Sequence, residues 1–335
     1  MNSRLKTKKN AVVMFAAAAF FFTLPIPQTF AKDEVLICST SEDYRIKYDT
    51  KRLKEEFPDL KIKIDYLPTG IMAAKILSEK KRSRCDIVME LEYGYLEKVS
   101  SYLANLPPPV LDAFVADVTA LPKDYEVKWV PALRNGGAIL INTEVLKKKG
   151  LPEPTSYEDL LKPEYRNLIS MPNPKTSGTG YMFLKSLVNK WGEKKAQEYF
   201  NKLSHNILQF TSSGSGPVNA LVQGEVGIGL GMTAQAVTEI NKGAPIKIIF
   251  FSEGSPFTLY GTGIVAGKEK NPDVQKVFTF VTTTLNQENN KLFFPEKVYK
   301  DLNFKLKNYP TDINYADMSK DNWSEKVRLL NDWKN

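Results

Sequence analysis

Short apolar runs alternate with helical periodicities along most of the chain after residue 31. Apolar or alternating runs bounded by turn residues predict strands, and apolar positions three and four apart predict helices. The strands that we predict cover residues 35–39, 61–66, 86–89, 137–142, 167–171, 206–210, 226–230, 246–251 and 260–266. The helices that we predict include one ending at Pro58, one opened by Thr69-Gly70, one with a capping box at 155–158, and those at 181–191, 273–285 and 325–333. This alternation predicts an α/β fold with parallel sheets, in which ligands bind beyond the carboxyl ends of the strands.

Three small, hydroxyl-rich segments each stand just before a predicted helix. They cover residues 174–180, 211–217 and 231–234. A helix N-terminus carries unpaired N–H groups and the positive end of the helix dipole, so it suits anions and other hydrogen-bond acceptors. One such segment is an ordinary capped helix, whereas three of them at strand ends favour a ligand-binding protein over a catalyst.

The N-terminus has the features of a secretory signal peptide. Residues 1–10 carry four basic residues and no acid, 11–24 are apolar apart from one threonine, and small residues flank a cut after Ala31. The apolar run is too short for a membrane span. No cysteine lies near the cut, so we expect no lipid anchor and a soluble, exported mature protein. Cleavage lowers the net charge from +8 to about +4, so we expect no nucleic-acid partner.

Few residues suited to catalysis or metal binding are present. The single histidine, His205, rules out a site built from several imidazoles, and no nucleophile stands beside a positioned base. A pair of carboxylates of the glycosidase kind stays open, but we expect no enzyme, cofactor or metal site. Cys38 and Cys85 fall near opposite ends of two predicted parallel strands, so we expect two buried thiols, although export makes a disulfide chemically possible.

Several segments resemble a known family. Residues 151–165, leading into 169–174 and 177–179, are similar to the periplasmic solute-binding proteins of ABC importers. The branch that they resemble holds ferric-ion, aminoethylphosphonate, thiamine, polyamine and hexose-phosphate binders. Supporting matches lie at residues 69–75, 224–226, 253–256, 261–265, 270–272 and 278–287.

The resemblance implies a type II periplasmic-binding-protein fold, in which a hinge joins two α/β lobes with parallel or mixed sheets. Crossing strands would lie near 131–136 and 258–263. After a signal peptide at 1–31, lobe one would comprise residues 32–133 and 259–335, and lobe two residues 134–258. A solute would bind in the cleft, favour the closed state by contacting both lobes, and be delivered by a monomeric protein to an inner-membrane permease.

The candidate ligand-binding residues suggest a phosphorylated, phosphonate or zwitterionic solute. Hydroxyl groups at helix starts could hold its oxygens, Arg134 could add a bidentate grip, and Tyr93 could cover it. The acids Glu42, Glu90 and Glu253 favour a zwitterion or a cation if they line the cleft. The full set that we predict is Ser39, Thr40, Ser41, Tyr93, Arg134, Ser177, Gly178, Thr179, Ser213, Gly214, Ser215, Thr233 and Glu253.

Two alternatives stay open. Ferric-ion binders of this branch carry a tyrosine pair after the strand that here ends near Gly231, where this chain reads Met232-Thr233-Ala234-Gln235. Fe(III) prefers phenolate and carboxylate oxygens, so this difference argues against a tyrosinate iron site. Iron bound through a carrier anion, or through Tyr93, Tyr95 and Glu92, is the minor hypothesis. The second alternative is an exported sensor that passes its solute-bound form to a signalling receptor.

Overall fold

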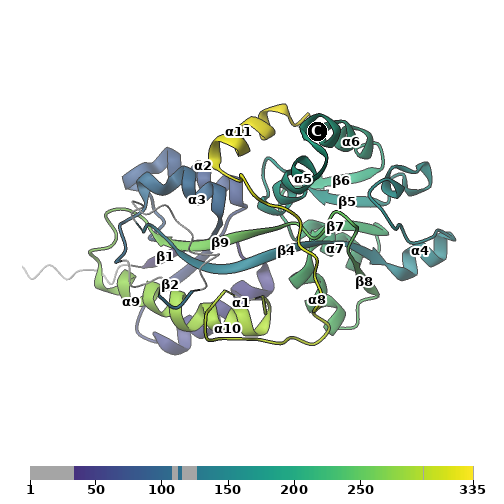
Figure 1. Cartoon of the computed structure of the whole chain (residues 1–335). Coiled ribbons are helices and arrows are strands. Elements are labelled where there is room, and N and C mark those ends of the chain that lie inside the picture. Colours follow the sequence, from purple (N-terminus) through teal and green to yellow (C-terminus); the bar gives the residue numbers. More distant parts are fainter. Residues whose placement is uncertain (1–33, 108–111, 115–126, 297, 335) are drawn as a thin grey trace, which may run out of the picture. The chain divides into compact units, whose positions relative to one another are not determined.

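The structure is a computed structural model that describes residues 34–107, 112–114, 127–296 and 298–334 (Figure 1). The signal peptide that we predict at 1–31 lies outside these residues. Residues 34–335 form one compact unit. None of the helices in the described part of the chain is long and apolar enough to cross a membrane.

A single mixed sheet of nine strands organises the described residues, in the order β2-β1-β3-β9-β4-β7-β5-β6, with β8 also pairing with β4. The strands are β1 (Val35–Ser39), β2 (Ile62–Tyr66), β3 (Ile87–Glu92), β4 (Val130–Asn142), β5 (Ile169–Pro172), β6 (Ile207–Thr211), β7 (Ile228–Met232), β8 (Ile246–Ile249) and β9 (Phe257–Ile264). We call β2, β1 and β3 the first half of the sheet, and β7, β5, β6 and β8 the second half.

The two long strands β4 and β9 join the two halves. Residues 130–136 of β4 pair antiparallel with β9, and residues 137–142 pair antiparallel with β7 and β8. β9 in turn pairs antiparallel with β3. Within each half the other pairs are parallel, so the prediction of parallel sheets holds only away from β4 and β9. The segments that we expected to cross between lobes lie within this β4–β9 pair.

Helices cover both faces of each half (Figure 1). On β4, Ile139 and Ile141 face one buried cluster with α5 and α6, whereas Ala138 and Leu140 face another with α7 and α8, because successive strand residues point to opposite faces. The helices are α1 (Asp43–Glu56), α2 (Thr69–Glu79), α3 (Tyr93–Val99), α4 (Thr143–Lys149), α5 (Gly178–Trp191), α6 (Glu193–Leu203), α7 (Gly216–Val222), α8 (Thr233–Asn241), α9 (Pro272–Phe280), α10 (Asn286–Leu292) and α11 (Trp323–Asp332).

Three local predictions were wrong. Residues 91–95, predicted as a loop, complete β3 and begin α3, because Leu96 and Val99 add buried positions at helical spacing. The capping box at 155–158 opens only a 3₁₀ turn at Asp159–Leu161, because Pro163 follows and disfavours a helical conformation in the residue before it. The helix predicted at 273–285 does not end at Leu285, because α9 continues through a π-helical turn at Val281–Leu285 into α10.

The expectation of two separate thiols is also wrong, because Cys38 and Cys85 form a disulfide. The strand register places Cys38 beside Val88, three residues after Cys85. However, β3 begins only at Ile87, so Cys85 lies before the strand and outside its register. The Cα atoms of Cys38 and Cys85 are 5.7 Å apart. Both cysteines are fully buried, against α2 and α3.

Removing this disulfide should destabilise the protein. The bond joins residues 47 positions apart, for which the entropy lost by the unfolded chain predicts a stabilisation of about 4 kcal/mol. We expect the Cys38→Ala/Cys85→Ala variant to unfold at a lower urea concentration than the oxidised wild type. The wild-type protein is then denatured without a reducing agent and treated with an alkylating reagent. Labelling of both cysteines would contradict the disulfide.

Candidate functional site

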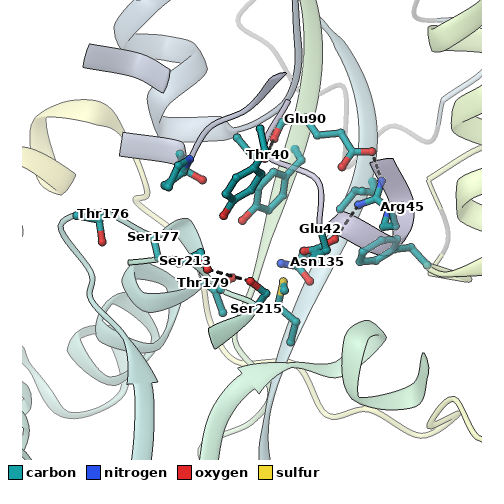
Figure 2. Close-up of a pocket in the computed structure, with 18 residues that line it drawn as sticks. Thr40, Glu42, Arg45, Glu90, Asn135, Thr176, Ser177, Thr179, Ser213 and Ser215 are labelled. Carbon is teal, nitrogen blue, oxygen red and sulfur yellow. Dashed lines mark hydrogen bonds and ion pairs between the residues drawn. The ribbon is translucent and has the colours of Figure 1, made fainter. Parts of the chain in front are cut away.

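One pocket lies between the carboxyl ends of strands from both halves of the sheet (Figure 2). About 440 Å³ of space, part of it open to solvent, lies between the atoms of its lining residues. Its lining is predominantly polar and comes from many separate segments. The lining residues are Thr40, Glu42, Arg45, Tyr66, Pro68, Thr69, Glu90, Leu133, Asn135, Thr176, Ser177, Thr179, Ser213, Gly214, Ser215, Met232, Tyr260 and Phe294.

The loops that precede α5 and α7 form one wall of the pocket, which we call the hydroxyl wall. Ser177 is the N-cap of α5 and accepts a hydrogen bond from the Gly180 N–H at 3.4 Å. Ser213 and Ser215 hydrogen-bond each other at 2.9 Å. The loops interlock, because any side chain at Gly214 would collide with Thr179. The hydroxyl wall consists of Thr176, Ser177, Thr179, Ser213, Gly214, Ser215 and Met232, and it contains no acidic side chain.

The opposite wall, which we call the charged wall, is built around Arg45 in the first turns of α1. The Arg45 guanidinium forms ion pairs with Glu90 and, at 3.4 Å, with Glu42, and it stacks 4.6 Å from the Phe294 ring centroid. Glu90 adopts a left-handed backbone conformation with φ of 56°, uncommon for a residue other than glycine. Thr40 donates a hydrogen bond to the Glu90 carbonyl (Figure 2).

Burial perturbs the ionisation of the charged wall. It raises the pKa of Glu42, an effect that Arg45 partly offsets. Burial lowers the pKa of Arg45, but the charges of Glu90 and Glu42 outweigh it and raise that pKa. When both carboxylates are ionised, the wall carries one net negative charge.

A third carboxyl group, that of Asp49, lies behind Arg45. Asn289 bridges the two, because it accepts a hydrogen bond from Arg45 Nε at 3.2 Å and donates one to Asp49 Oδ1 at 2.7 Å. Burial raises the pKa of Asp49 to about 7, although Arg45 favours the ionised form. Asp49 is therefore partly protonated near neutral pH.

The floor of the pocket comes from β4 and β9. Leu133 and Asn135 of β4 and Tyr260 of β9 line it. The Oδ1 atom of Asn135 is buried and has no hydrogen-bond partner among the residues that the structure describes. Arg134 is absent from the lining: it stacks 5.2 Å from the Phe257 ring centroid, because alternate strand residues point to opposite faces.

The structure brings together six of the site residues that we predicted. Those that line the pocket are Thr40, Ser177, Thr179, Ser213, Gly214 and Ser215. Ser39 and Ser41 lie behind the charged wall, where their hydroxyls are 2.8 Å apart and Ser41 donates to Glu90. Tyr93 packs against Trp129, and Glu253 accepts a hydrogen bond from Ser252. Thr233 and Gly178 are buried outside the lining.

Other lining residues were missed, or only considered, at the level of sequence. Glu42 and Glu90 were considered as pocket candidates. Arg45 could have been found, because it follows Glu42 by one helical turn. Phe294 comes from the chain after α10, and no local pattern marks it.

Two observations describe the groups that could ligate a metal. Among the residues that the structure describes, no group of three or more His, Cys, Asp or Glu side chains could hold a metal ion. Burial raises the pKa values of the two tyrosines in the pocket lining, Tyr66 and Tyr260.

Elements on the two sides of the pocket contact each other at its edge. The Gly70 N–H donates to the Thr176 carbonyl at 3.2 Å, and the Tyr95 hydroxyl donates to the Lys175 carbonyl at 3.2 Å. Tyr66 and Ser213 also share a side-chain hydrogen bond. A molecule in this pocket would therefore touch both halves of the sheet.

Comparison with known proteins defines the family. The model of the bacterial extracellular solute-binding proteins matches residues 91–321, more than half of the chain. The chain belongs to this family. The description of this family is that of binding proteins, not of enzymes. The described elements form a type II periplasmic-binding-protein fold. The periplasmic binding protein P5PA has this fold, with a TM-score of 0.77 and 23% identity over 90% of this chain and 98% of that one. AfuA from Actinobacillus pleuropneumoniae with fructose-6-phosphate bound also has it, with a TM-score of 0.77 and 24% identity over 90% of this chain and 97% of that one.

Sequence relatives of this solute-binding protein have varied descriptions. An uncharacterized protein of Haemophilus influenzae is 27% identical over 78% of this chain and 75% of its own length. A spermidine/putrescine-binding periplasmic protein of Salmonella typhimurium is 27% identical over 47% of this chain and 44% of its own. A putative 2-aminoethylphosphonate-binding periplasmic protein of Salmonella typhi is 22% identical over 63% of this chain and 61% of its own length.

Replacing Asp49 should change how stability depends on pH. Because burial raises its pKa above the unfolded value, the folded state holds the proton more tightly, and stability is lost as pH rises through about 7. We expect Asp49→Asn to abolish roughly 1–4 kcal/mol of the decline in unfolding free energy between pH 4 and pH 8.

The measurement is urea denaturation at both pH values. Asp43→Asn, an exposed change on the same helix, is the control and should keep the wild-type decline. Equal pH dependence of Asp49→Asn and the wild type would contradict this assignment.

Proposed function

We propose that this protein is the periplasmic substrate-binding component of an ABC importer and that it captures a small solute with a phosphate or phosphonate group. The hydroxyl wall would hold that group, and the charged wall would hold an amine or hydroxyl group at the other end. The observation that carries the proposal is the hydroxyl-lined start of α5 facing the Glu42–Arg45–Glu90 cluster across one pocket.

The hydroxyl wall suits a tetrahedral anion. Thr176, Ser177, Thr179, Ser213 and Ser215 supply hydroxyl groups, and the 14-residue helix α5 places the positive end of its dipole beside them. Hydrogen bonds to a charged group contribute about 1.5–3 kcal/mol each. No carboxylate on this wall opposes an anion.

The charged wall and the floor suit a hydrogen-bond donor. Arg45 forms ion pairs with both Glu42 and Glu90, and when both carboxylates are ionised the wall has one net negative charge that an ammonium group would neutralise. The unpartnered Oδ1 atom of Asn135 would accept a further hydrogen bond, since buried acceptors are rarely left without one. A polyamine fits less well, because its second ammonium would face uncharged hydroxyl groups.

The relatives are consistent with such a solute. One is described as a putative 2-aminoethylphosphonate-binding protein, and a neighbour in fold has fructose-6-phosphate bound. Both names describe molecules with a phosphorus-containing anion and a hydrogen-bonding remainder. The spermidine/putrescine-binding relatives match a smaller part of this chain.

Transport would follow from closure around the solute. We infer that lobe one comprises residues 32–133 and 259–335, lobe two comprises residues 134–258, and β4 and β9 form the hinge. A solute that contacts both walls favours their closed arrangement, which a membrane permease would recognise. The signal peptide at residues 1–31 would direct a monomeric protein to the periplasm.

Removing the serine hydroxyls of the second loop should weaken binding. We expect Ser213→Ala/Ser215→Ala to bind 2-aminoethylphosphonate or fructose 6-phosphate at least about tenfold more weakly, through the loss of hydrogen bonds to the anion. Isothermal titration calorimetry on both solutes, with putrescine and ferric citrate beside them, measures this.

The matched control is Ser212→Ala, an exposed neighbour outside the pocket lining, which should leave affinity unchanged. Wild-type protein that binds putrescine or ferric citrate, and neither phosphorus-containing solute, would contradict the proposed solute class.

A further inference from the structure

The C-terminal helix α11 packs against both halves of the described structure (Figure 1). Near its start, the ring centroid of Trp323 lies 5.6 Å from that of Tyr95 of α3. The backbone N–H of Trp323 donates a hydrogen bond to the Glu97 carboxylate at 2.7 Å. At its end, Trp333 lies 5.3 Å from Phe200 of α6. Helix α11 therefore bridges elements that β4 and β9 also connect.

Lys326, in the middle of α11, reaches inward between these elements. Its side chain is fully buried and forms an ion pair with Glu92, which is also fully buried. The ammonium lies 4.2 Å from the Tyr95 ring centroid and 4.1 Å from that of Tyr181. Gly94 makes room for it, since a Cβ atom there would lie 3.0 Å from Lys326 Cδ.

Glu92 lies directly behind the hydroxyl wall. A Cβ atom on Gly178, the first residue of α5, would lie 3.0 Å from Glu92 Cγ, and the Thr258 hydroxyl donates to Glu92 Oε1 at 3.3 Å. Burial, followed by the charge of Glu92, raises the pKa of the pocket residue Tyr260. The charge of Glu92 therefore acts at the floor of the solute pocket.

An unpaired carboxylate at this position would oppose an anion at the start of α5. It would repel the anion and be stabilised by the same helix dipole. The neighbouring carboxyl group of Asp321 accepts a hydrogen bond from Tyr181 at 2.9 Å, and burial together with Glu92 raises its pKa to about 6. Lys326 is the cation that pairs with Glu92 itself.

We propose that Lys326 is a positioning residue of the solute site: it neutralises Glu92 behind the N-terminus of α5, so that this wall can accept an anionic solute. The proposal rests on the proposed function for its anionic solute. The pairing of Lys326 with Glu92 does not depend on which solute binds.

Four variants separate this role from simple packing. Lys326→Met keeps the length of the side chain and leaves Glu92 unpaired, Glu92→Gln removes the carboxylate, and Lys326→Met/Glu92→Gln removes both charges. Lys185→Met is the matched control: Lys185 is also buried in this region and pairs at 3.4 Å with Glu325 rather than Glu92.

The first readout needs no solute. The groups that face Lys326 or Glu92 are Asp321, Tyr95, Tyr181, Tyr260 and the Lys98 ammonium, whose pKa burial and Lys326 lower. In Lys326→Met, the buried Glu92 must take up a proton on folding, so stability falls as pH rises. Between pH 5 and pH 8, the thermal midpoint of this variant should fall by about 5 °C more than the midpoint of the wild type does. The double variant should not show this additional fall, and a fall of wild-type size in Lys326→Met would overturn the proposal.

The second readout is the affinity for 2-aminoethylphosphonate and fructose 6-phosphate by calorimetry at pH 8. We expect Lys326→Met to bind at least tenfold more weakly, and Glu92→Gln and the double variant to stay within about threefold of the wild type. Lys185→Met should also keep its affinity. A double variant as weak as Lys326→Met would show a packing role and overturn the proposal.

The two readouts keep the two proposals apart. If the wild type binds neither solute, the proposed solute class fails, while the pH dependence of stability still decides whether Lys326 neutralises Glu92. If Lys326→Met does not fold, Glu92→Gln decides: affinity retained supports the proposal, and a tenfold loss overturns it.

Discussion

Strand β4 pairs with β9 over its first half and with β7 and β8 over its second, so it belongs to both halves of the sheet. Its change of partner at Gly136–Gly137 places Leu133 and Asn135 at the floor of the pocket. The strand ends on either side supply the walls. The β4–β9 pair therefore both joins the two halves of the sheet and lines the pocket.

The two walls differ in chemistry because they bury different kinds of polar group. The charged wall buries a guanidinium that is stable only because Glu90 and Glu42 surround it, since an unpaired buried charge is costly. The hydroxyl wall uses neutral groups at helix starts, and the carboxylate behind it, Glu92, is paired with Lys326. Neutral hydroxyl groups on one wall and acidic groups on the other would orient a solute with unlike ends.

Much of this architecture could be predicted from the sequence. Apolar periodicity located nearly every strand, and the hydroxyl-rich segments at 174–180 and 211–217 lie at the pocket because helix starts follow strand ends. Those predictions depend on local chemistry. The family was recognised on the same grounds, from residues spread along the chain.

The remaining features depend on contacts between distant residues. Strand alternation decides that Asn135 and not Arg134 faces the pocket, and its phase could not be set without the pairing partner. The disulfide depends on where β3 begins, and Phe294 and Lys326 reach the site from the last third of the chain. No local pattern of residues encodes such contacts.

The central claim is that a solute with a phosphorus-containing anion joins the two walls. Native mass spectrometry of the mature protein purified from a periplasm, compared with its denatured mass, tests it most directly. We expect the native mass to exceed the denatured mass by that of one small phosphate- or phosphonate-bearing molecule. An excess equal to one iron ion, with visible colour, or to a polyamine would contradict the account.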